Sequence, residues 1–282
     1  MYTFKYFHSL LNFFRKANLK IFDTWENIQT CKLFFIRKDF PIFWPNSAGA
    51  TREKTSIALR TIDNVFMNLA SFSNYELLSV DQFRKALNRN PDSRQLEKLF
   101  VKYGSDKSTS HNYEKVYEVL FENTQSVTKV FEVGIGSTNL QIVSNMGSLG
   151  NPGASLRAFR DYFENAEIFG ADIDQDILFT EHRINTLYLD QLSPKQFDED
   201  LKSIGSEFDL VIDDGLHAID ANLNILFFFM PLLKNDGFLV IEDIPKAAAP
   251  FWLTMARFIS DKGESWLIDT KGGMLFVFQK TG

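Results

Sequence analysis

The stretch KVFEVGIG, residues 129–136, is an apolar run that ends in a glycine-rich turn. Four similar short runs follow it, at residues 166–173, 185–191, 208–215 and 237–244. Between and after these runs we predict helices at 138–146, 153–164, 175–183, 194–204 and 219–234. Strands that alternate with helices are typical of a parallel sheet covered on both faces. The order of elements therefore predicts an α/β fold with a doubly wound sheet.

The C-terminal end departs from this alternation. SWLI (265–268) and MLFVFQK (274–280) flank DTKGG, which is the pattern of an antiparallel hairpin. We therefore expect a Rossmann-like, mostly parallel sheet that closes with an antiparallel hairpin. Residues 55–102 have a mostly helical pattern with a break near Asn90-Pro91. We predict a mainly helical N-terminal segment at 1–95, a lid or an oligomerisation element, followed by one domain at 96–282.

The charge of the chain is unevenly distributed. The net charge is −6 over 282 residues, and residues 1–60 carry +6 while the remainder carries −12. An acidic body argues against nucleic acid as a partner. A single cysteine, Cys31, excludes an internal disulfide and a cysteine-based zinc site, which fits a cytoplasmic location. We expect neither a membrane span nor a secretion signal.

The first twenty residues form an amphipathic pattern. Phe4, Phe7, Leu10, Leu11 and Phe14 fall on one helical face, with basic residues nearby. We interpret this stretch as a helix that packs on the main domain or on a partner subunit. Attachment to a membrane surface is the alternative, and the aromatic face is compatible with a homo-oligomer.

Polar residues at the strand ends indicate the ligand, because open parallel sheets bind ligands beyond the carboxyl ends of their strands. The first strand runs into Glu132, Gly134, Gly136 and Ser137. Such glycines let the backbone approach a ligand, and the next helix offers free amides. The stretch is not the dinucleotide fingerprint, because Asn139 stands where the third glycine would be.

The second and third strands end in aspartates. Asp172 is placed to accept both hydroxyls of a ribose, and Asp190 to accept from an adenine amino group. The alternative for each is a helix N-cap. Acidic groups at successive strand ends favour a nucleoside ligand.

Two adjacent pairs of carboxylates end the fourth and fifth strands. These are Asp213-Asp214 and Glu242-Asp243, and no lysine or arginine lies beside either pair in the sequence until Lys246. Neighbouring strands would bring the pairs together, where like charges repel unless a cation lies among them or some take up protons. A hard ion such as Mg²⁺ or Mn²⁺ fits oxygen ligands. The alternative is that both pairs are N-caps in loops.

The histidines differ in their placing. His217, three residues after Asp214, lies where a reacting hydroxyl would need a base. We interpret His8 and His182 as structural, with His182 in a predicted helix. His111 lies in the loop SDKSTSHNY, in which we expect Lys107 to meet a carboxylate or the whole loop to be solvated.

Over residues 96–282 the sequence resembles the class I S-adenosylmethionine-dependent methyltransferases. The resemblance is carried by FEVGIGS, IFGADID, LDQ and the terminal hairpin. KYGSDKSTSHNY (102–113), GASLRAFRDYF, DDGLH and VIEDI are similar to the metal-dependent macrolide sugar O-methyltransferases of the mycinamicin and macrocin type. The first ninety residues match neither, and Leu216 replaces an expected small polar residue.

The resemblance implies a role for each site residue. Cofactor contacts would come from Tyr103, Ser105, Lys107, His111, Glu132, Gly134, Gly136, Ser137, Asp172, Asp190, Gln191 and Asp213, the last being either structural or cofactor-binding. The Tyr103–His111 loop would close over the methionine end. Asp214, Glu242 and Asp243 would bind the metal, with His217 and Asp214 as catalytic residues.

These features predict a SAM-dependent, Mg²⁺-dependent O-methyltransferase that acts on a hydroxyl of a sugar, a glycosylated metabolite or a polysaccharide. A metal-independent methyltransferase, a nucleotide-dependent oxidoreductase or epimerase, and a non-enzymatic scaffold are the alternatives. The acceptor itself is not encoded in any motif, because function resides in sites added to a fold.

Overall fold

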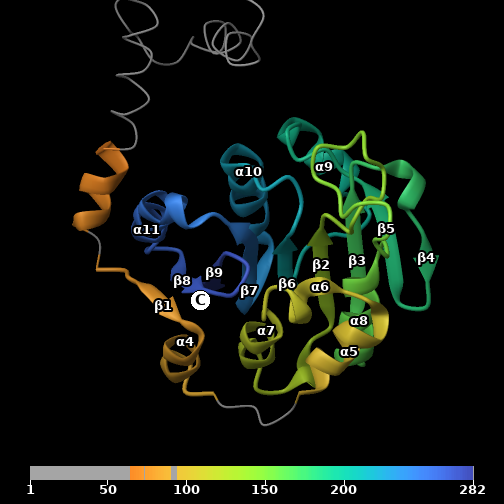
Figure 1. Ribbon diagram of the computed structural model, residues 1–282, viewed down its shortest axis with the longest axis horizontal. Coiled ribbons are helices and arrows are strands. Elements are labelled where there is room, and N and C mark those ends of the chain that lie inside the picture. The colour runs from red at the N-terminus through yellow and green to blue at the C-terminus, as the bar shows by residue number, and fades with distance from the viewer. Residues whose placement is uncertain (1–63, 73, 90–93, 282) are drawn as a thin grey trace, which may run out of the picture. The chain divides into compact units, whose positions relative to one another are not determined.

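The structure is a computed structural model that describes residues 64–72, 74–89 and 94–281. The described residues form a nine-stranded sheet with the order β1-β8-β9-β7-β6-β2-β3-β5-β4 (Figure 1). The strands are β1 (Leu77–Ser79), β2 (Lys129–Val133), β3 (Glu167–Asp172), β4 (Thr180–Glu181), β5 (Ile184–Tyr188), β6 (Phe208–Asp213), β7 (Leu233–Ile244), β8 (Gly263–Asp269) and β9 (Met274–Lys280).

The fold class is confirmed. Strands β5, β3, β2, β6 and β7 run parallel to one another. Strand β9 lies antiparallel between β7 and β8, as the hairpin pattern predicted. Two short strands extend the edges: β1 pairs parallel with β8, and β4 pairs antiparallel with β5.

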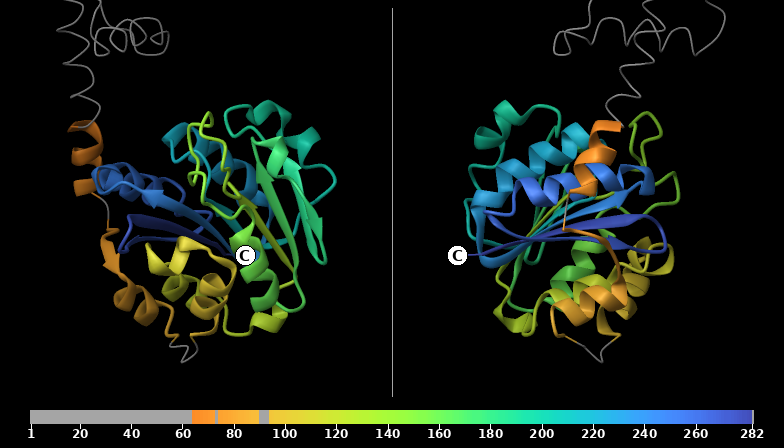
Figure 2. Two further views of the ribbon diagram at one scale, coloured as in Figure 1. Left: turned by 45° about the vertical axis from the view of Figure 1, so that its right-hand side comes forward. Right: turned by 90° about the vertical axis from the view of Figure 1, so that its left-hand side faces the viewer.

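Helices cover both faces of the sheet (Figures 1 and 2). One layer contains α4 (Val80–Ala86), α5 (Gln95–Tyr103), α6 (Asp106–Thr109), α7 (Glu114–Leu120) and α8 (Ala154–Tyr162). The other contains α9 (Phe197–Asp200), α10 (Ile219–Phe229) and α11 (Ala249–Phe258). A further helix spans residues 64–71, and short 3-10 turns join several elements: η2 (Thr124–Ser126), η3 (Gln175–Ile177), η4 (Pro194–Gln196), η5 (Met230–Leu232) and η6 (Lys246–Ala248).

The sheet separates two apolar cores, because successive side chains of a strand point to opposite faces. Val130 packs in the core beneath α4, α5, α7 and α8, whereas its neighbour Phe131 packs in the core beneath α9, α10 and α11. Leu210 and Val211 divide in the same way. Burial on both faces explains why these strands are continuous apolar runs in the sequence.

Two of the predicted helices are wrong. Residues 138–146 are irregular, because Ser137 and Asn139 side chains accept from nearby backbone N–H groups and compete with helical hydrogen bonds. Residues 175–183 form η3 and β4, so His182 lies in a turn and not in a helix. The predicted helix at 194–204 is shortened to η4 and α9, whereas α8 and α10 fall within their predicted ranges.

Residues Phe66–Gly282 form one compact unit. It includes β1 and α4, which precede residue 95 in the sequence. The amphipathic stretch near the N-terminus lies outside the described residues. No helix of the described chain is long and apolar enough to cross a membrane.

The order of strands reverses next to β2. The chain runs outward from β2 through β3 to β5, and then returns to place β6 on the other side of β2. Such a reversal opens a crevice beyond the carboxyl ends of the two central strands. The ligand site is therefore expected where β2 and β6 end.

Candidate active site

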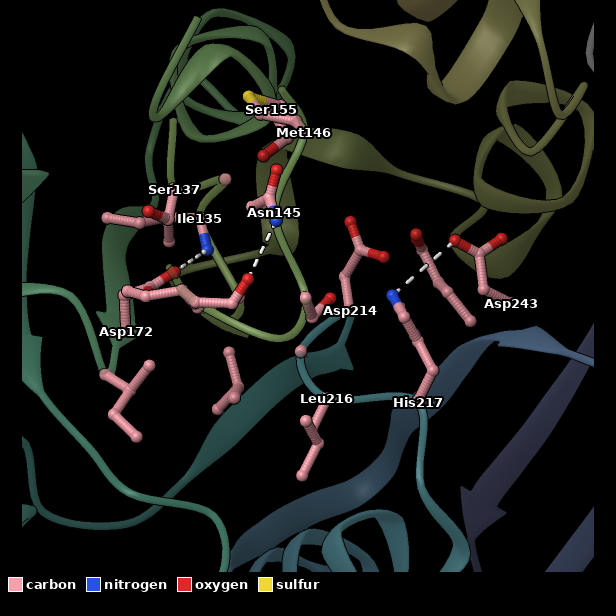
Figure 3. Close-up of a pocket in the computed structure, with 18 of the residues that line it drawn as sticks. Ile135, Ser137, Asn145, Met146, Ser155, Asp172, Asp214, Leu216, His217 and Asp243 are labelled. Atoms are coloured by element: carbon pink, nitrogen blue, oxygen red, sulfur yellow. Dashed lines mark hydrogen bonds and ion pairs between the residues drawn. The ribbon is translucent and has the colours of Figure 1, made fainter. Parts of the chain in front are cut away.

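A cavity of about 880 Å³ lies at these strand ends. It is lined by the carboxyl ends of β2, β3, β6 and β7, by segment 105–113 and by the irregular segment 141–146. In Figure 3 Asp214, His217 and Asp243 lie together on one side of the cavity, and Ile135 and Asp172 on the other. The position expected from the strand order is confirmed.

The glycine-rich turn brings β2 against the segment that follows β6. Gly134 and Gly136 have φ of +83° and +93°, in the left-handed region that favours glycine. A Cβ on Gly134 would lie 2.1 Å from the carbonyl oxygen of Asp214. The two strand ends therefore approach this closely only because residue 134 lacks a side chain. Ser137 lines the cavity beyond the turn.

Two aspartates at the end of β3 hold this turn in place. Asp172 Oδ2 accepts from the amide of Ile135 at 2.9 Å, and Oδ1 accepts from the amide of Asp174. Asp174 in turn accepts from the hydroxyl of Ser137 at 2.5 Å. Burial raises the pKa of Asp172 above its usual value, while the backbone donors oppose that rise. Asp172 thus supports the turn in addition to facing the cavity.

Asp190 stabilises a local turn and is not a helix N-cap, since the N-cap of η4 is Ser193. Its Oδ1 accepts from Leu192 N at 3.0 Å, and its Oδ2 accepts from the Ser193 hydroxyl at 2.8 Å. Asp190 also lines the cavity. Its contact with an adenine stays a prediction.

Asp213 makes structural contacts, the first of the two roles considered for it from the sequence. Its side chain is fully buried and does not line the cavity. It accepts hydrogen bonds from Gln191 at 2.7 Å and Asn222 at 2.9 Å. Gln191 also accepts from the amide of Leu216, so it ties the loop after β5 to the loop after β6. Burial raises the pKa of Asp213.

Asp214, His217 and Asp243 form the group most suited to a metal. Each offers an atom within 4.8 Å of the others, and all three are half-buried. His217 Nε2 lies 3.8 Å from Asp243 Oδ2 (Figure 3). His217 and Asp243 both have φ of +54°, unusual for residues other than glycine and typical of functional sites. The bend that turns Asp243 toward Asp214 coincides with a register shift in β7 between Ile241 and Ile244.

The other carboxylate oxygen of Asp243, Oδ1, contacts two side chains of segment 105–113. Tyr113 donates to Asp243 Oδ1, and His111 Nδ1 lies 3.3 Å from the same oxygen. His111 also pairs with Asp106, and this hydrogen bond, with the nearby carboxylates, raises the pKa of His111 despite its partial burial. A Cβ on Gly272, at the tip of the β8–β9 hairpin, would lie 1.9 Å from His111 Nδ1. The hairpin therefore approaches His111 this closely only because residue 272 lacks a side chain, and His111 contacts Asp243 in addition to lining the cavity.

Lys107 lies inside the cluster of carboxylates. Its Nζ lies 2.7 Å from Asp214 Oδ2, 2.5 Å from Glu242 Oε2 and 3.2 Å from Glu132 Oε1. Burial alone would lower the pKa of Lys107, but the three carboxylates raise it well above its ordinary value. The expectation that Lys107 meets a carboxylate is confirmed. No lysine or arginine lies beside the two carboxylate pairs in the sequence, and segment 105–113 brings one to them in the folded protein.

The two glutamates of the cluster, Glu132 and Glu242, form ion pairs with Lys107. Glu132 is fully buried, does not line the cavity and accepts from the Ser155 hydroxyl at 2.7 Å. Its contact with the cofactor stays a prediction, and in this structure its side chain contacts Lys107 and Ser155. Glu242 accepts from Tyr117 as well as from Lys107, so both its oxygens have protein donors. Burial raises the pKa of Glu242, and Lys107 opposes that rise.

Tyr103 also departs from its predicted role. Its hydroxyl donates to Asp161 on α8 at 2.5 Å, and its side chain does not line the cavity. As the last residue of α5 it faces α8, because the chain turns at Gly104 (φ +76°) before it reaches the cavity at Ser105.

Four residues of the site have roles that the sequence did not reveal: Tyr113, Tyr117, Ser155 and Asp174. Tyr113 and Ser155 lie within the quoted motifs, and Asp174 follows Asp172 by two residues. Tyr117 is a buried helix residue with no signal beyond its amphipathic spacing.

No protein-family model matches the chain. It is 31% identical to the 8-demethyl-8-alpha-L-rhamnosyl tetracenomycin-C 2'-O-methyltransferase of Streptomyces olivaceus, over 54% of this chain and 38% of that protein. It is 30% identical to the mycinamicin VI 2''-O-methyltransferase of Micromonospora griseorubida, over 57% of this chain and 38% of that protein. Across 57% of its length the chain is thus similar to O-methyltransferases of the mycinamicin and macrocin type.

Solved structures agree on the methyltransferase fold. The MycE methyltransferase of the mycinamycin biosynthetic pathway, in complex with Mg, SAH and mycinamycin VI, is 22% identical. The similarity covers 67% of this chain and 55% of that one, with a TM-score of 0.54. The resemblance predicted from the sequence is confirmed. The chain spans less than half the length of the sugar O-methyltransferases that it matches.

Proposed function

We propose that this protein is an S-adenosylmethionine-dependent O-methyltransferase that acts on a hydroxyl of a sugar or glycosylated small molecule. The observation that carries the proposal is the group of Asp214, His217 and Asp243 beside the glycine-rich turn of β2. A base and two carboxylates thus line the same cavity as the loop expected to hold the methyl donor. The names of the curated relatives support a hydroxyl of a sugar as the acceptor.

The donor would bind along the end of β2. Gly134 and Gly136 leave the backbone open to a ligand, and Ser137 lines the same wall. Asp172 reaches the cavity from β3, where a carboxylate is suited to ribose hydroxyls, and Asp190 lies beyond it. Ser105, Lys107 and His111 approach the cavity from the segment that follows α5.

The donor set fits a hard divalent cation such as Mg²⁺ or Mn²⁺. Asp214 and Asp243 would hold it, because each keeps a carboxylate oxygen toward the shared space. Glu242 was predicted as a third ligand, and that role stays a prediction because its oxygens accept from Lys107 and Tyr117. Such a cation, when bound, lowers the pKa of a coordinated hydroxyl.

His217 would be the general base. It is half-buried in the loop after β6, and its Nε2 lies 3.8 Å from Asp243 Oδ2. His217 would take the proton from the acceptor hydroxyl as that oxygen forms a bond to the methyl carbon of the bound donor, with the electrons of the broken carbon–sulfur bond left on the donor sulfur. The chain's further contribution is to hold the two reactants in line.

Transfer of a radiolabelled methyl group from S-adenosylmethionine tests the proposal. The acceptors would be rhamnosylated and olivosylated polyketides, with the aglycones alone as controls. We expect transfer only to the glycosylated acceptors. His217→Gln should reduce kcat at least a hundredfold with unchanged affinity for S-adenosylhomocysteine, whereas His182→Gln, at an exposed turn, should behave as the wild type.

Failure to bind S-adenosylhomocysteine, or full turnover by His217→Gln, would refute the proposal. Treatment with EDTA distinguishes metal-dependent from metal-independent methyl transfer. Turnover that is unchanged by EDTA would show that the protein transfers the methyl group without a metal.

A further inference from the structure

The lysine within the carboxylate cluster is the feature that points furthest beyond the proposed activity. Lys107 lies on α6, and its side chain is only 3% exposed. Its three carboxylate partners are Glu132 of β2, Glu242 of β7 and Asp214, the residue directly after β6. Because β7, β6 and β2 are adjacent in the sheet, one ammonium joins three neighbouring strand ends.

The partners of Lys107 are of two kinds, two buried glutamates and one partly exposed aspartate. Glu132 and Glu242 are almost fully buried, and the second oxygen of each accepts from a hydroxyl, that of Ser155 or of Tyr117. Asp214 is 24% exposed and faces the cavity. The ammonium therefore fixes two carboxylates in the interior and contacts a third that also belongs to the candidate metal group.

The charges make Lys107 a competitor of a bound metal. A lysine ammonium at 2.7 Å lowers the negative potential that Asp214 presents to any second cation. Glu242 Oε2 likewise contacts the ammonium, at 2.5 Å. A site with all its carboxylates free would bind a divalent ion more tightly.

We propose that Lys107 is a positioning residue that acts as a resident cation. It holds Asp214 and Glu242 and thereby weakens the binding of a divalent ion at Asp214 and Asp243, beside His217. This inference rests on the proposed metal-assisted methyl transfer, because it concerns the same site. The carboxylate cluster then has two cation positions. The ammonium of Lys107 occupies one, and an exchangeable divalent ion would occupy the other.

The test is the affinity for Mn²⁺ of the full chain, measured by calorimetry and by the electron paramagnetic resonance signal of free Mn²⁺. Neither methyl donor nor acceptor is present, so the result does not depend on turnover. Lys107→Met removes the ammonium and keeps the length of the side chain. We expect this variant to bind Mn²⁺ at least tenfold more tightly than the wild type.

A control and a second variant make the result specific. Lys234→Met removes the same charge from an ion pair with Asp209 near the amino end of β6, and should leave Mn²⁺ affinity unchanged. Lys107→Met with Glu132→Gln removes one buried carboxylate along with its partner, which keeps the variant measurable if the single change prevents folding. Its Mn²⁺ affinity should also rise.

Weaker or unchanged Mn²⁺ binding in the Lys107 variants would overturn the inference, as would the absence of Mn²⁺ binding in every variant. If Lys107 had only a structural role, its replacement would lower the stability of the protein and weaken metal binding. If the Lys107 variants bind Mn²⁺ more tightly while no glycosylated acceptor is methylated, the inference stands and the proposed function fails.

Discussion

Replacing Gly134 by alanine tests whether the close approach of β2 and the segment after β6 builds the site. A left-handed φ costs a residue with a Cβ about 1 kcal/mol. The new Cβ would also lie 2.1 Å from the backbone oxygen of Asp214, and overpacking of this kind adds about 1–3 kcal/mol. We expect a loss of roughly 2–4 kcal/mol in the free energy of unfolding, and a Tm lowered by roughly 5–15 °C.

Gly205→Ala is the matched control. Gly205 has φ of +66°, but the nearest atom to an added Cβ, Lys129 Nζ, is 3.9 Å away. This variant should lose only the backbone contribution of about 1 kcal/mol. The difference between the two variants isolates the contact with Asp214.

Calorimetric unfolding and titration with S-adenosylhomocysteine provide the assay. Gly134→Ala should bind this ligand at least tenfold more weakly, because the turn and Asp214 must move apart, whereas Gly205→Ala should bind it as the wild type does. Equal Tm values and equal affinities in the two variants would show that the missing side chain at residue 134 does not shape the site.

Three further outcomes are expected. Tyr113→Phe removes the donor to Asp243 Oδ1 and should slow methyl transfer about tenfold or more without loss of fold, as steady-state kinetics and circular dichroism would show; wild-type rates would contradict this role. Mn²⁺ at a hundred times its Kd should stabilise the protein by about 2.7 kcal/mol, and Asp243→Asn should lose most of that gain in thermal unfolding; an equal gain would remove Asp243 from the metal site. Burial raises the pKa of Glu114 to about 7, so its stabilising contribution is complete below its usual value and is lost as pH rises through about 7. Glu114→Gln should therefore exceed the wild type in stability at pH 8 by up to roughly 3 kcal/mol, with little difference at pH 4.5, in urea unfolding at both values; a constant difference would refute the assignment.

Much of the fold could be predicted because its signals are local. Each central strand is a short apolar run bounded by polar residues, and each such run became a strand. The errors fell at 138–146 and 175–183, where side chains of Ser137, Asn139 and Thr186 bind the backbone and replace helical hydrogen bonds. A periodic pattern contains no information on that competition.

The candidate site could be predicted only in part. Asp214 and Asp243 were recognisable because carboxylates at adjacent strand ends must lie close together, and His217 because it follows the first pair. The resemblance implied a cofactor contact for Glu132, and either a cofactor contact or a structural role for Asp213; the fold buries both, and neither lines the cavity. Which face a side chain takes at a strand end depends on the bend of the chain there, and the sequence does not specify that bend.

The sequence by itself determined the succession of strands and helices along the chain, the position of the ligand site at the carboxyl ends of the strands and the acidic character of that site. Only the tertiary structure decided how the acidic charge is balanced. Lys107 is 107 residues from Asp214 and 135 from Glu242 along the chain, yet it contacts both. Local patterns encode secondary structure, whereas contacts at such separations exist only after helices and sheet have packed together.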